Sequence, residues 1–408
     1  MSIAHGVPPM TRARERLAIA ALTGIQMSHI LDFMVLMPLG PQMMRLFGIT
    51  PTQFGLLVAV YTGSAAVASL LAAFVIDRFE RKRALLVLYG CFGLTALLSA
   101  SAQTYGTLLA ARAIAGIFGG VLTACVLSIT TDITPEGRRG RALGAVMSAF
   151  AITSILALPV ALWLANHLSW RLAYVVVACM VLVIAVAAVF LLPTLRGHIA
   201  ARRERGALGQ VRAVLAVPNH LRALALAGLL NFGGFSIVPF ISPYLVLNVG
   251  VKEDELPMLY FLGGFLSFFT VRIVGRLTDR MNRRKLFFAG AGASMVCMAA
   301  LTNLPPVPLV LAMAVSLSMF CAFPARYIPA MAVITSAVQP SLRGSFMGLS
   351  AFMQHASTGV ATLIASLIVA RAADGTLQHY NRVGWIAMGA TVVAIWLLPR
   401  IHAAPKQG

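Results

Sequence analysis

The stretch "DRFERKR" at residues 77–83 directly follows residues 52–76, a run without a single charged side chain. A variant of it, "DRMNRRK", occupies residues 279–285, again directly after an apolar run. The two stretches lie 202 positions apart in a chain in which only 11% of the residues are charged. Two basic clusters at this separation indicate that the chain repeats one structural plan.

The composition places the chain in a lipid environment. Of its 408 residues, 59% are hydrophobic, and the mean hydropathy is +0.87. A soluble domain carries about 25% charged residues, and a single water-soluble globule of this length cannot bury so much apolar surface. We therefore expect an all-α membrane protein.

Apolar windows long enough to cross a bilayer recur along the whole chain. A helix needs about 20 residues to cross ~30 Å of hydrocarbon, and such segments must be helices because lipid offers no partners to backbone groups. The first window runs beyond the apolar core of a signal peptide, so we interpret it as an uncleaved helix. The twelve windows are 17–41, 52–76, 84–103, 106–131, 142–165, 172–193, 223–247, 257–278, 286–303, 307–335, 345–370 and 383–399.

The distribution of charge orients the chain. A net charge of +20 would suggest nucleic-acid binding in a soluble protein. Most of the 32 Lys and Arg residues, however, fall in the N-terminal segment, the tail and the loops on one side of the predicted membrane. This asymmetry predicts that both termini face the cytoplasm in a cell inner (plasma) membrane, with no nucleic-acid partner.

Enzymatic and metal-binding signatures are lacking. The five cysteines all fall in apolar windows, without paired spacing that would indicate a disulfide framework or a zinc site. The sequence contains no phosphate-binding loop and no nucleophile motif. We therefore expect no enzyme activity, no metal and no cofactor.

Landmarks other than the basic clusters share the same offset. Phe33 and Pro41 in the first window match Phe235 and Pro243 in the seventh, also 202 residues apart. Because six windows separate the two basic clusters, both clusters lie on the same side of the membrane. This arrangement predicts two parallel six-helix repeats around a central cavity, the plan of a transporter that rocks about a central site.

The expected domain limits follow from the windows. Residues 1–193 form the first six-helix half, and residues 223–408 form the second. The basic segment 194–222 between them is expected to be a cytoplasmic linker.

The basic clusters resemble a loop motif of the major facilitator superfamily, G-x-x-x-D-R-x-G-R-[RK]-[RK]. The second half, "GRLTDRMNRRK", has Asn282 in place of the second glycine, and the first half, "AFVIDRFERKR", has Ala73 and Glu80 at the two glycines. The stretch "RAIAGIFGG" at 112–120 is similar to the helix-4 motif of the twelve-span drug/proton antiporter branch, which includes predicted sugar-efflux permeases.

The resemblance implies that the loop motif closes one face of the protein. In the family, the motif's Asp caps a neighbouring helix N-terminus and its arginines pair with acids at adjacent helix ends. Asp132 is the expected partner of Arg78 or Arg81, whereas the alternative is that the motif only anchors the topology. The expected gating residues are Asp77, Arg78, Arg81, Asp132, Asp279, Arg280 and Arg283.

Asp32 is the only carboxylate deep within a predicted span. Its burial near the membrane centre costs roughly 2.5–3.5 kcal/mol on insertion scales, which indicates a function. Counting helix rise from the two membrane faces places Arg112 at the same depth, and His29 lies on the same helical face as Asp32. We expect Asp32, Arg112 and His29 to couple transport to protons; the alternative is a purely structural ion pair.

The second half departs from this chemistry, because Gly234 stands at the position equivalent to Asp32. Polar side chains that we expect near the substrate are Asn231, Gln354, His355 and Arg326. For each of them the alternative is a purely structural role, since polar groups in membrane helices often form interhelical hydrogen bonds.

These features predict a secondary active transporter that exports a small organic molecule in exchange for protons. The family's helix-5 antiporter signature is glycine-rich, whereas here Pro159 is kept with Ala157 and Ala161 at glycine positions. Proton-linked import of a metabolite, or a membrane sensor on the same scaffold, therefore remain alternatives. The expected partners are a small molecule, protons and the lipid bilayer, and we expect a monomer.

Overall fold

The computed structural model describes residues 11–75, 79–195, 207–339 and 342–404. Twelve of its helical segments are long and apolar enough to cross a membrane, which confirms the predicted multi-pass, all-α fold. The first half contains α1 (Arg12–Val35), α2 (Gly40–Leu46), α3 (Pro51–Val75), α4 (Arg81–Ser101), α5 (Tyr105–Ile133), α6 (Arg139–Met147), α7 (Ala149–Ile152), η3 (Thr153–Ala157), α8 (Leu158–His167) and α9 (Trp170–Leu191).

The second half repeats this plan after α11 (Ala207–Leu215), a short helix of the region between the halves. A small antiparallel pair, β1 (Ala370–Arg371) and β2 (Leu377–Gln378), connects the last two spans. The helices of this half are α12 (Pro218–Phe235), η4 (Val238–Phe240), α13 (Ile241–Tyr244), η5 (Leu245–Val249), α14 (Leu256–Arg280), α15 (Arg283–Thr302), α16 (Leu309–Ser336), α17 (Arg343–Ile368) and α18 (Tyr380–Leu397).

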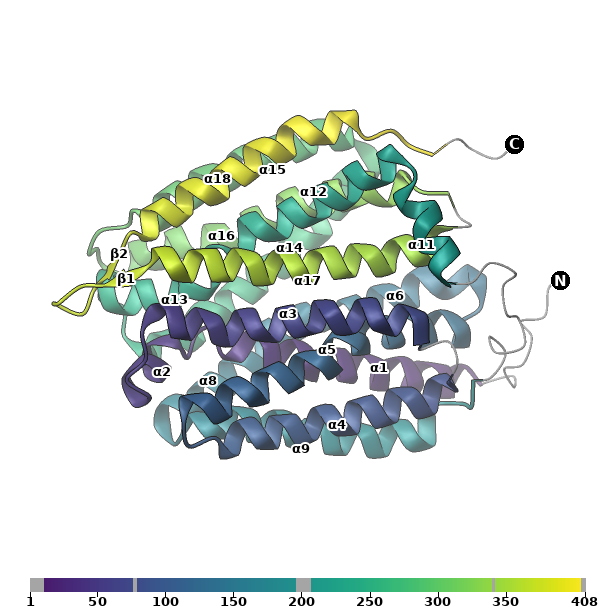
Figure 1. The fold of residues 1–408 in the computed structure, drawn as a ribbon, viewed down its shortest axis with the longest axis horizontal. Helices are drawn as coiled ribbons and strands as arrows, with labels where there is room; N and C mark the ends of the chain where they lie inside the picture. The colour runs from purple at the N-terminus through teal and green to yellow at the C-terminus, as the bar shows by residue number, and fades with distance from the viewer. Residues whose placement is uncertain (1–10, 76–78, 196–206, 340–341, 405–408) are drawn as a thin grey trace.

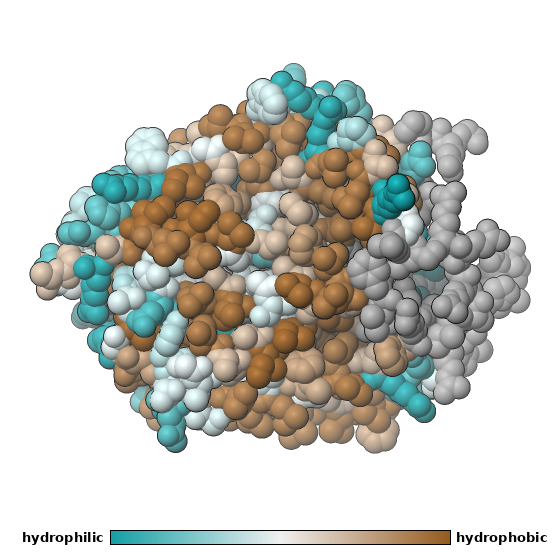
Figure 2. All heavy atoms as spheres, viewed as in Figure 1, coloured by the Kyte–Doolittle hydropathy of each residue, from teal (hydrophilic) through white to brown (hydrophobic). Residues whose placement is uncertain are grey.

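The two groups of helices lie beside each other, with α3 and α17 adjacent along the boundary (Figure 1). The first helix begins, and the last one ends, at the end of the bundle opposite the β1–β2 pair (Figure 1). Hydrophobic side chains cover the middle of the surface, and hydrophilic ones gather toward the ends (Figure 2). This distribution is that of a protein whose belt faces lipid. The domain limits 1–193 and 223–408 stay a prediction.

Two glycines of the 112–120 stretch set the spacing between α5 and α3. A Cβ built on Gly116 would lie 2.1 Å from the carbonyl oxygen of Tyr61, and one built on Gly120 would lie 2.4 Å from that of Ala65. Only glycine allows the two backbones to approach this closely, as at other small-residue interfaces between membrane helices.

Three spans are not continuous α-helices. The first, predicted as 17–41, ends at Val35 and resumes as α2, since the turn between them carries Pro38 and α2 begins at Gly40–Pro41. The fifth contains the π-helical turn η3 just before Pro159, and the seventh breaks after Phe235. Prolines remove backbone donors, and membrane helices tolerate such breaks where neighbours satisfy the freed groups.

In the described part of the chain, the hydrogen bonds and ion pair between the two halves lie at the end of the bundle that holds β1 and β2. The guanidinium of Arg45 forms a bidentate ion pair with Glu253, with 2.9 Å between Nη2 and Oε2, and Asn166 Nδ2 donates to the Glu253 carbonyl over 2.8 Å. We call Arg45, Asn166 and Glu253 the Glu253 clamp. Nearby, Thr52 donates to the Ser366 carbonyl over 2.9 Å. The halves are thus joined at this end.

Candidate functional site

An ion pair buried within the first half forms the centre of the site. Arg112 Nη1 on α5 donates to Asp32 Oδ2 on α1 over 2.8 Å, and Nη2 donates to the Asp32 backbone carbonyl over 3.2 Å. Both side chains are 1% exposed. The pairing predicted from helix depth is therefore confirmed. Asp32 Oδ1 has no hydrogen-bond partner in the described part of the chain, so one acceptor of the carboxylate remains free.

Aromatic rings enclose the Arg112 guanidinium. Its Cζ lies 4.4 Å from the ring centroid of Tyr61 on α3 and 5.8 Å from that of Tyr174 on α9. The hydroxyls of both tyrosines are buried and unpartnered among the described residues. A cation over such ring faces gains about 0.5–2 kcal/mol, more when water is excluded. The rings thus stabilise the charge of Arg112 partly independently of Asp32.

His29 lies one helical turn before Asp32, beside the same tyrosine. Its ring centroid is 6.5 Å from that of Tyr61 and 5.9 Å from that of Phe92. Neither ring nitrogen has a hydrogen-bond partner within the described ranges, although both are buried. His29 is also close enough to His355 of the second half for the two imidazoles to interact electrostatically. The structure thus brings these two predicted residues together across the boundary between the halves.

The predicted polar residues of the second half form a small network. The hydroxyl of Tyr327 donates to Gln354 Oε1 over 2.8 Å, and Gln354 Nε2 donates to Ser350 Oγ over 3.1 Å. The side chain of Asn231 lies within hydrogen-bonding reach of the same tyrosine hydroxyl and donates to the Ala227 carbonyl over 3.0 Å. Hydrogen bonds within and between helices therefore account for much of this polarity.

Arg326 occupies a different setting from the rest of that group. Its guanidinium is buried between helices of the second half, where Nη1 donates to Thr391 Oγ1 over 2.8 Å and Nη2 to the Leu230 carbonyl over 3.4 Å. At the position equivalent to Asp32, a Cβ on Gly234 would lie 1.9 Å from the Phe323 ring. In each half, an arginine on the fourth span reaches the first span. Only in the first half does that span provide a carboxylate as its partner.

Half-buried aromatic side chains cross from one half to the other beside Asp32. Phe33 lies 5.5 Å from Tyr61 and 5.7 Å from Phe235, measured between ring centroids. Phe235 lies 6.5 Å from Phe323, which stacks on Tyr327 at 6.2 Å. We call Phe33, Phe235, Phe323 and Tyr327 the aromatic row. All four side chains are half-buried rather than sealed in a core.

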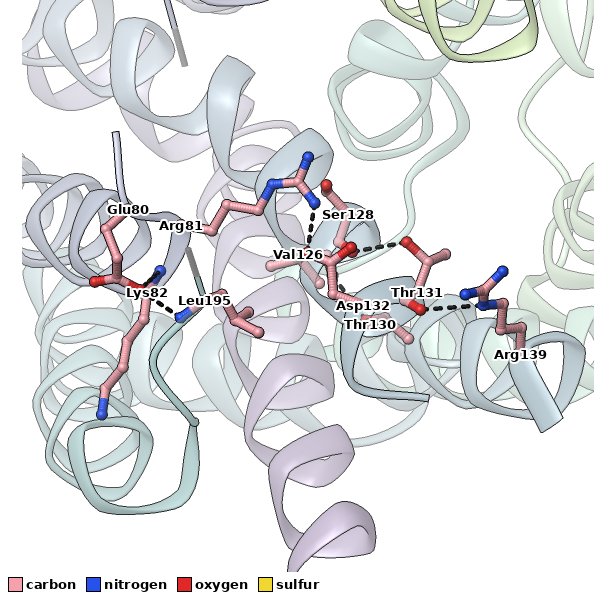
Figure 3. A network of polar contacts seen from close by, with 10 residues as sticks. All are labelled: Glu80, Arg81, Lys82, Val126, Ser128, Thr130, Thr131, Asp132, Arg139 and Leu195. Atoms are coloured by element: carbon pink, nitrogen blue, oxygen red, sulfur yellow. Dashed lines mark hydrogen bonds and ion pairs between the residues drawn. The ribbon is translucent and has the colours of Figure 1, made fainter. Parts of the chain in front are cut away.

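The loop motif of the first half forms the predicted ion pair. Figure 3 shows Arg81 at the start of α4 reaching Asp132 near the end of α5, and the two side chains form an ion pair. Asp77 and Arg78, also expected here, lie outside the described residues. Glu80, which replaces the family's second glycine, accepts from the backbone N–H groups of Lys82 and Arg83 and from that of Leu195 beyond α9. Glu80 therefore caps α4 and ties it to the end of the sixth span (Figure 3).

Among the described residues, the matching loop of the second half forms no such ion pair. Arg283 Nη1 donates to the Ala332 carbonyl on α16 over 3.5 Å, and Asp279 and Arg280 are exposed. Asn282, the counterpart of Glu80, caps α15 by accepting from the N–H groups of Arg284 and Lys285. The capping function of this position is thus repeated, whereas the charge pairing is not.

No metal-binding constellation is present in the described part of the chain. It contains no group of three or more His, Cys, Asp or Glu side chains placed to hold a metal ion. The five cysteines are free.

Sequence reasoning missed Tyr61, Tyr174 and the aromatic row. Tyrosine is rare here, with eight in the chain, and a tyrosine in the middle of an apolar span was a usable signal. It also missed the Glu253 clamp, because Arg45 on α2, Asn166 on α8 and Glu253 in the short helical turn before α14 are brought together only in the folded bundle.

Comparison with known proteins places the chain in a family. The model of the Major Facilitator Superfamily matches residues 22–362 and 224–407. A chloramphenicol resistance protein of Streptomyces lividans is 26% identical over 244 residues, which cover 60% of this chain and 62% of that protein. A probable sugar efflux transporter of Helicobacter pylori is 25% identical over 235 residues, or 58% of this chain and 59% of that protein. The chain therefore spans about six-tenths of the length of these curated relatives.

A solved structure agrees on the architecture. The crystal structure of a D-xylose–proton symporter aligns with a TM-score of 0.77 over 95% of this chain and 97% of that one, at 15% sequence identity. Such a likeness concerns the fold alone. With the family match over both halves, the twelve spans and the parallel repeats, the chain belongs to the major facilitator superfamily.

Proposed function

We propose that the protein is a secondary active transporter that exports a small organic molecule in exchange for protons by alternating access. The observation that carries the proposal is the buried Asp32–Arg112 pair, in which one carboxylate oxygen, Oδ1, has no partner among the described residues. Burying an ionisable pair at this depth costs free energy, and such residues usually mark a functional site. The names of the two relatives, one a chloramphenicol resistance protein and the other a probable sugar efflux transporter, favour export.

The geometry suggests how a proton and a substrate compete. A proton that binds Asp32 Oδ1 neutralises the carboxylate, yet Arg112 keeps its hydrogen bond to the Asp32 carbonyl and its position against the Tyr61 ring. Arg112 therefore need not move when the proton binds. A substrate that donates a hydrogen bond to the same oxygen favours the ionised form, so binding of one releases the other.

The available driving force is sufficient for accumulation. One proton that crosses a potential of 100 mV releases ~2.3 kcal/mol. That free energy corresponds to a substrate gradient of roughly fifty-fold.

Alternating access requires two gates. With both termini in the cytoplasm of a cell inner membrane, the end closed by the Glu253 clamp faces outward, so we propose that this conformation opens toward the cytoplasm. The Arg81–Asp132 pair joins α4 to α5 within the first half on the cytoplasmic side and is formed in this conformation, so we propose that it keeps these helix ends together while the halves rock. Both halves contribute to the site within one chain, so we propose a functional monomer.

Direction and coupling are tested together in everted vesicles that hold an acidic interior, with chloramphenicol and D-xylose as first probes. An exporter exchanges added probe for interior protons, so a pH-sensitive acridine dye should report partial collapse of the gradient. A proton-linked importer gives no such collapse, which would overturn export.

The role of Asp32 is tested with Asp32→Asn. This variant should lose gradient-driven transport but keep exchange of labelled for unlabelled probe, because exchange needs no net proton movement. The matched control is Glu15→Gln, which removes the other buried carboxylate of α1, paired with Arg138 at 2.7 Å. Full gradient-driven transport by Asp32→Asn would remove Asp32 from the mechanism.

A further inference from the structure

We propose that the substrate carries a planar aromatic ring, rather than the saturated ring of a sugar. This inference rests on the proposed transport function and specifies its substrate class. It starts from the aromatic row, whose four rings meet where the two halves face each other beside Asp32.

The aromatic row offers ring faces at the right place. Phe33 directly follows Asp32 on α1, and Phe235 on α12 lies 5.7 Å from it across the boundary between the halves. When the halves rock, these two rings separate, because they belong to different halves. A planar ring that enters between them replaces the ring–ring contact that is lost, and such pairs are favoured at centroid separations of 4.5–7 Å.

The polar side chains of the second half beside the row are already hydrogen-bonded. Gln354 accepts from Tyr327 and donates to Ser350, and Asn231 donates to its own helix. In the described part of the chain, the unpartnered polar atoms on the first-half side include Asp32 Oδ1, both His29 nitrogens and the Tyr61 hydroxyl, and all of them are buried. The row itself therefore presents ring faces rather than free hydrogen-bonding groups.

Binding to the purified full-length chain in detergent, without any proton gradient, tests the proposal. The probes are chloramphenicol, which carries a benzene ring, and D-xylose, which carries only hydroxyls on a saturated ring. Benzamide and cyclohexanecarboxamide form a second pair that differs in ring aromaticity alone. We expect the aromatic member of each pair to raise the unfolding temperature and to give a measurable Kd, and the other member to do neither.

Ring-removing variants locate the effect. Phe33→Leu and Phe235→Leu keep apolar volume but lose the ring face, and each should weaken chloramphenicol binding about 3- to 10-fold. The matched control is Phe190→Leu on the lipid-facing side of α9, where the ring is 74% exposed, and it should leave the Kd unchanged. The unfolding temperature of each variant without probe reports whether it remains folded.

The inference is overturned if D-xylose binds and the aromatic probes do not, if no aromatic probe binds, or if both ring variants bind like the unmodified chain. Its failure is distinguishable from failure of the proposed function. Selective aromatic binding with gradient-driven transport intact in Asp32→Asn would refute proton coupling at Asp32 and leave the substrate class standing. Collapse of the proton gradient on addition of D-xylose would support proton-coupled export and refute the substrate class.

Discussion

Gly116 on α5 lies directly against the carbonyl oxygen of Tyr61 on α3, so that a Cβ at Gly116 would come within 2.1 Å of that oxygen. The close approach is what brings the Tyr61 ring over the Arg112 guanidinium, one helical turn before Gly116. Gly116 therefore supports the ion pair indirectly, because it sets the distance between the backbones of α5 and α3.

Gly116→Ala should destabilise the protein, because the new methyl group can be relieved only by moving backbone. We expect a loss of about 1–3 kcal/mol, the usual cost of overpacking, seen as a lower unfolding temperature in detergent. Gly106→Ala, on the same helix with no atom within 4 Å of a new Cβ, is the matched control. It should be neutral or slightly stabilising, since alanine favours helix. Equal effects of the two substitutions would contradict the close-packing explanation.

Arg112→Gln should be far more damaging than loss of an exposed ion pair. It leaves the Asp32 carboxylate buried without its cation, at an expected cost of about 3–5 kcal/mol. Adding Asp32→Asn should restore part of that stability, because the double variant buries no net charge. Arg138→Gln breaks the partly exposed pair with Glu15 and should cost only about 0–1 kcal/mol. Thermal unfolding of the unmodified chain, the double variant and the single variants Arg112→Gln, Asp32→Asn and Arg138→Gln checks this order, and a double variant as unstable as the sum of its parts would refute it.

The sequence predicted the features that depend on spacing along one helix or on membrane depth. The twelve apolar windows correspond to twelve membrane-spanning segments, and counting the helix rise from the membrane faces predicted that Asp32 and Arg112 lie at the same depth. The resemblance of the loop motif likewise predicted that Asp132 pairs with Arg78 or Arg81, and the structure shows the pair with Arg81. These predictions succeed because a bilayer fixes both the length and the vertical placement of every span.

Features that depend on helix rotation and on the order of helices in space were not predictable. No spacing in one chain says that Tyr61 rather than another α3 residue lies over Arg112. Arg326 was expected beside the substrate, but its guanidinium bonds Thr391 and the Leu230 carbonyl between helices, and its role there stays a prediction. Rotation about the helix axis is set by packing between elements far apart in sequence, which a hydropathy pattern does not record.

Glu253→Gln should loosen the closed end of the bundle. The bidentate pair with Arg45 loses its charge, although Asn166 still donates to the backbone carbonyl of residue 253. Partly exposed ion pairs contribute about 0.2–1 kcal/mol, so we expect the open population to rise about 1.5- to 5-fold. Labelling of Ser366→Cys, a position fully buried between the halves, by a membrane-impermeant maleimide measures that population in a background without the five native cysteines.

The matched control for the clamp is Asp254→Asn, which removes a neighbouring exposed carboxylate outside the clamp. It should leave the labelling rate of Ser366→Cys unchanged. Identical labelling rates in the Glu253→Gln and unmodified backgrounds would show that the ion pair contributes nothing to closure, and that packing such as Gly40 against Pro243 closes this end alone.

The caps at Glu80 and Asn282 predict a pH-dependent difference between equivalent positions of the two halves. Burial, the largest single influence, would raise the pKa of Glu80, but hydrogen bonds from the N–H groups of Leu195, Arg83 and Lys82 together lower that pKa below its ordinary value of 4.5. A carboxylate with a lowered pKa stabilises the folded state above its unfolded pKa, and the contribution disappears as the pH falls through the folded pKa.

Glu80→Ala should therefore lower the unfolding temperature at pH 7, by an amount corresponding to about 0.5–2 kcal/mol, and the difference should shrink below pH 4.5. Asn282→Ala removes a cap that does not titrate, so its effect should be the same at both pH values. Parallel pH profiles for the two variants would mean that the Glu80 charge adds nothing to its cap.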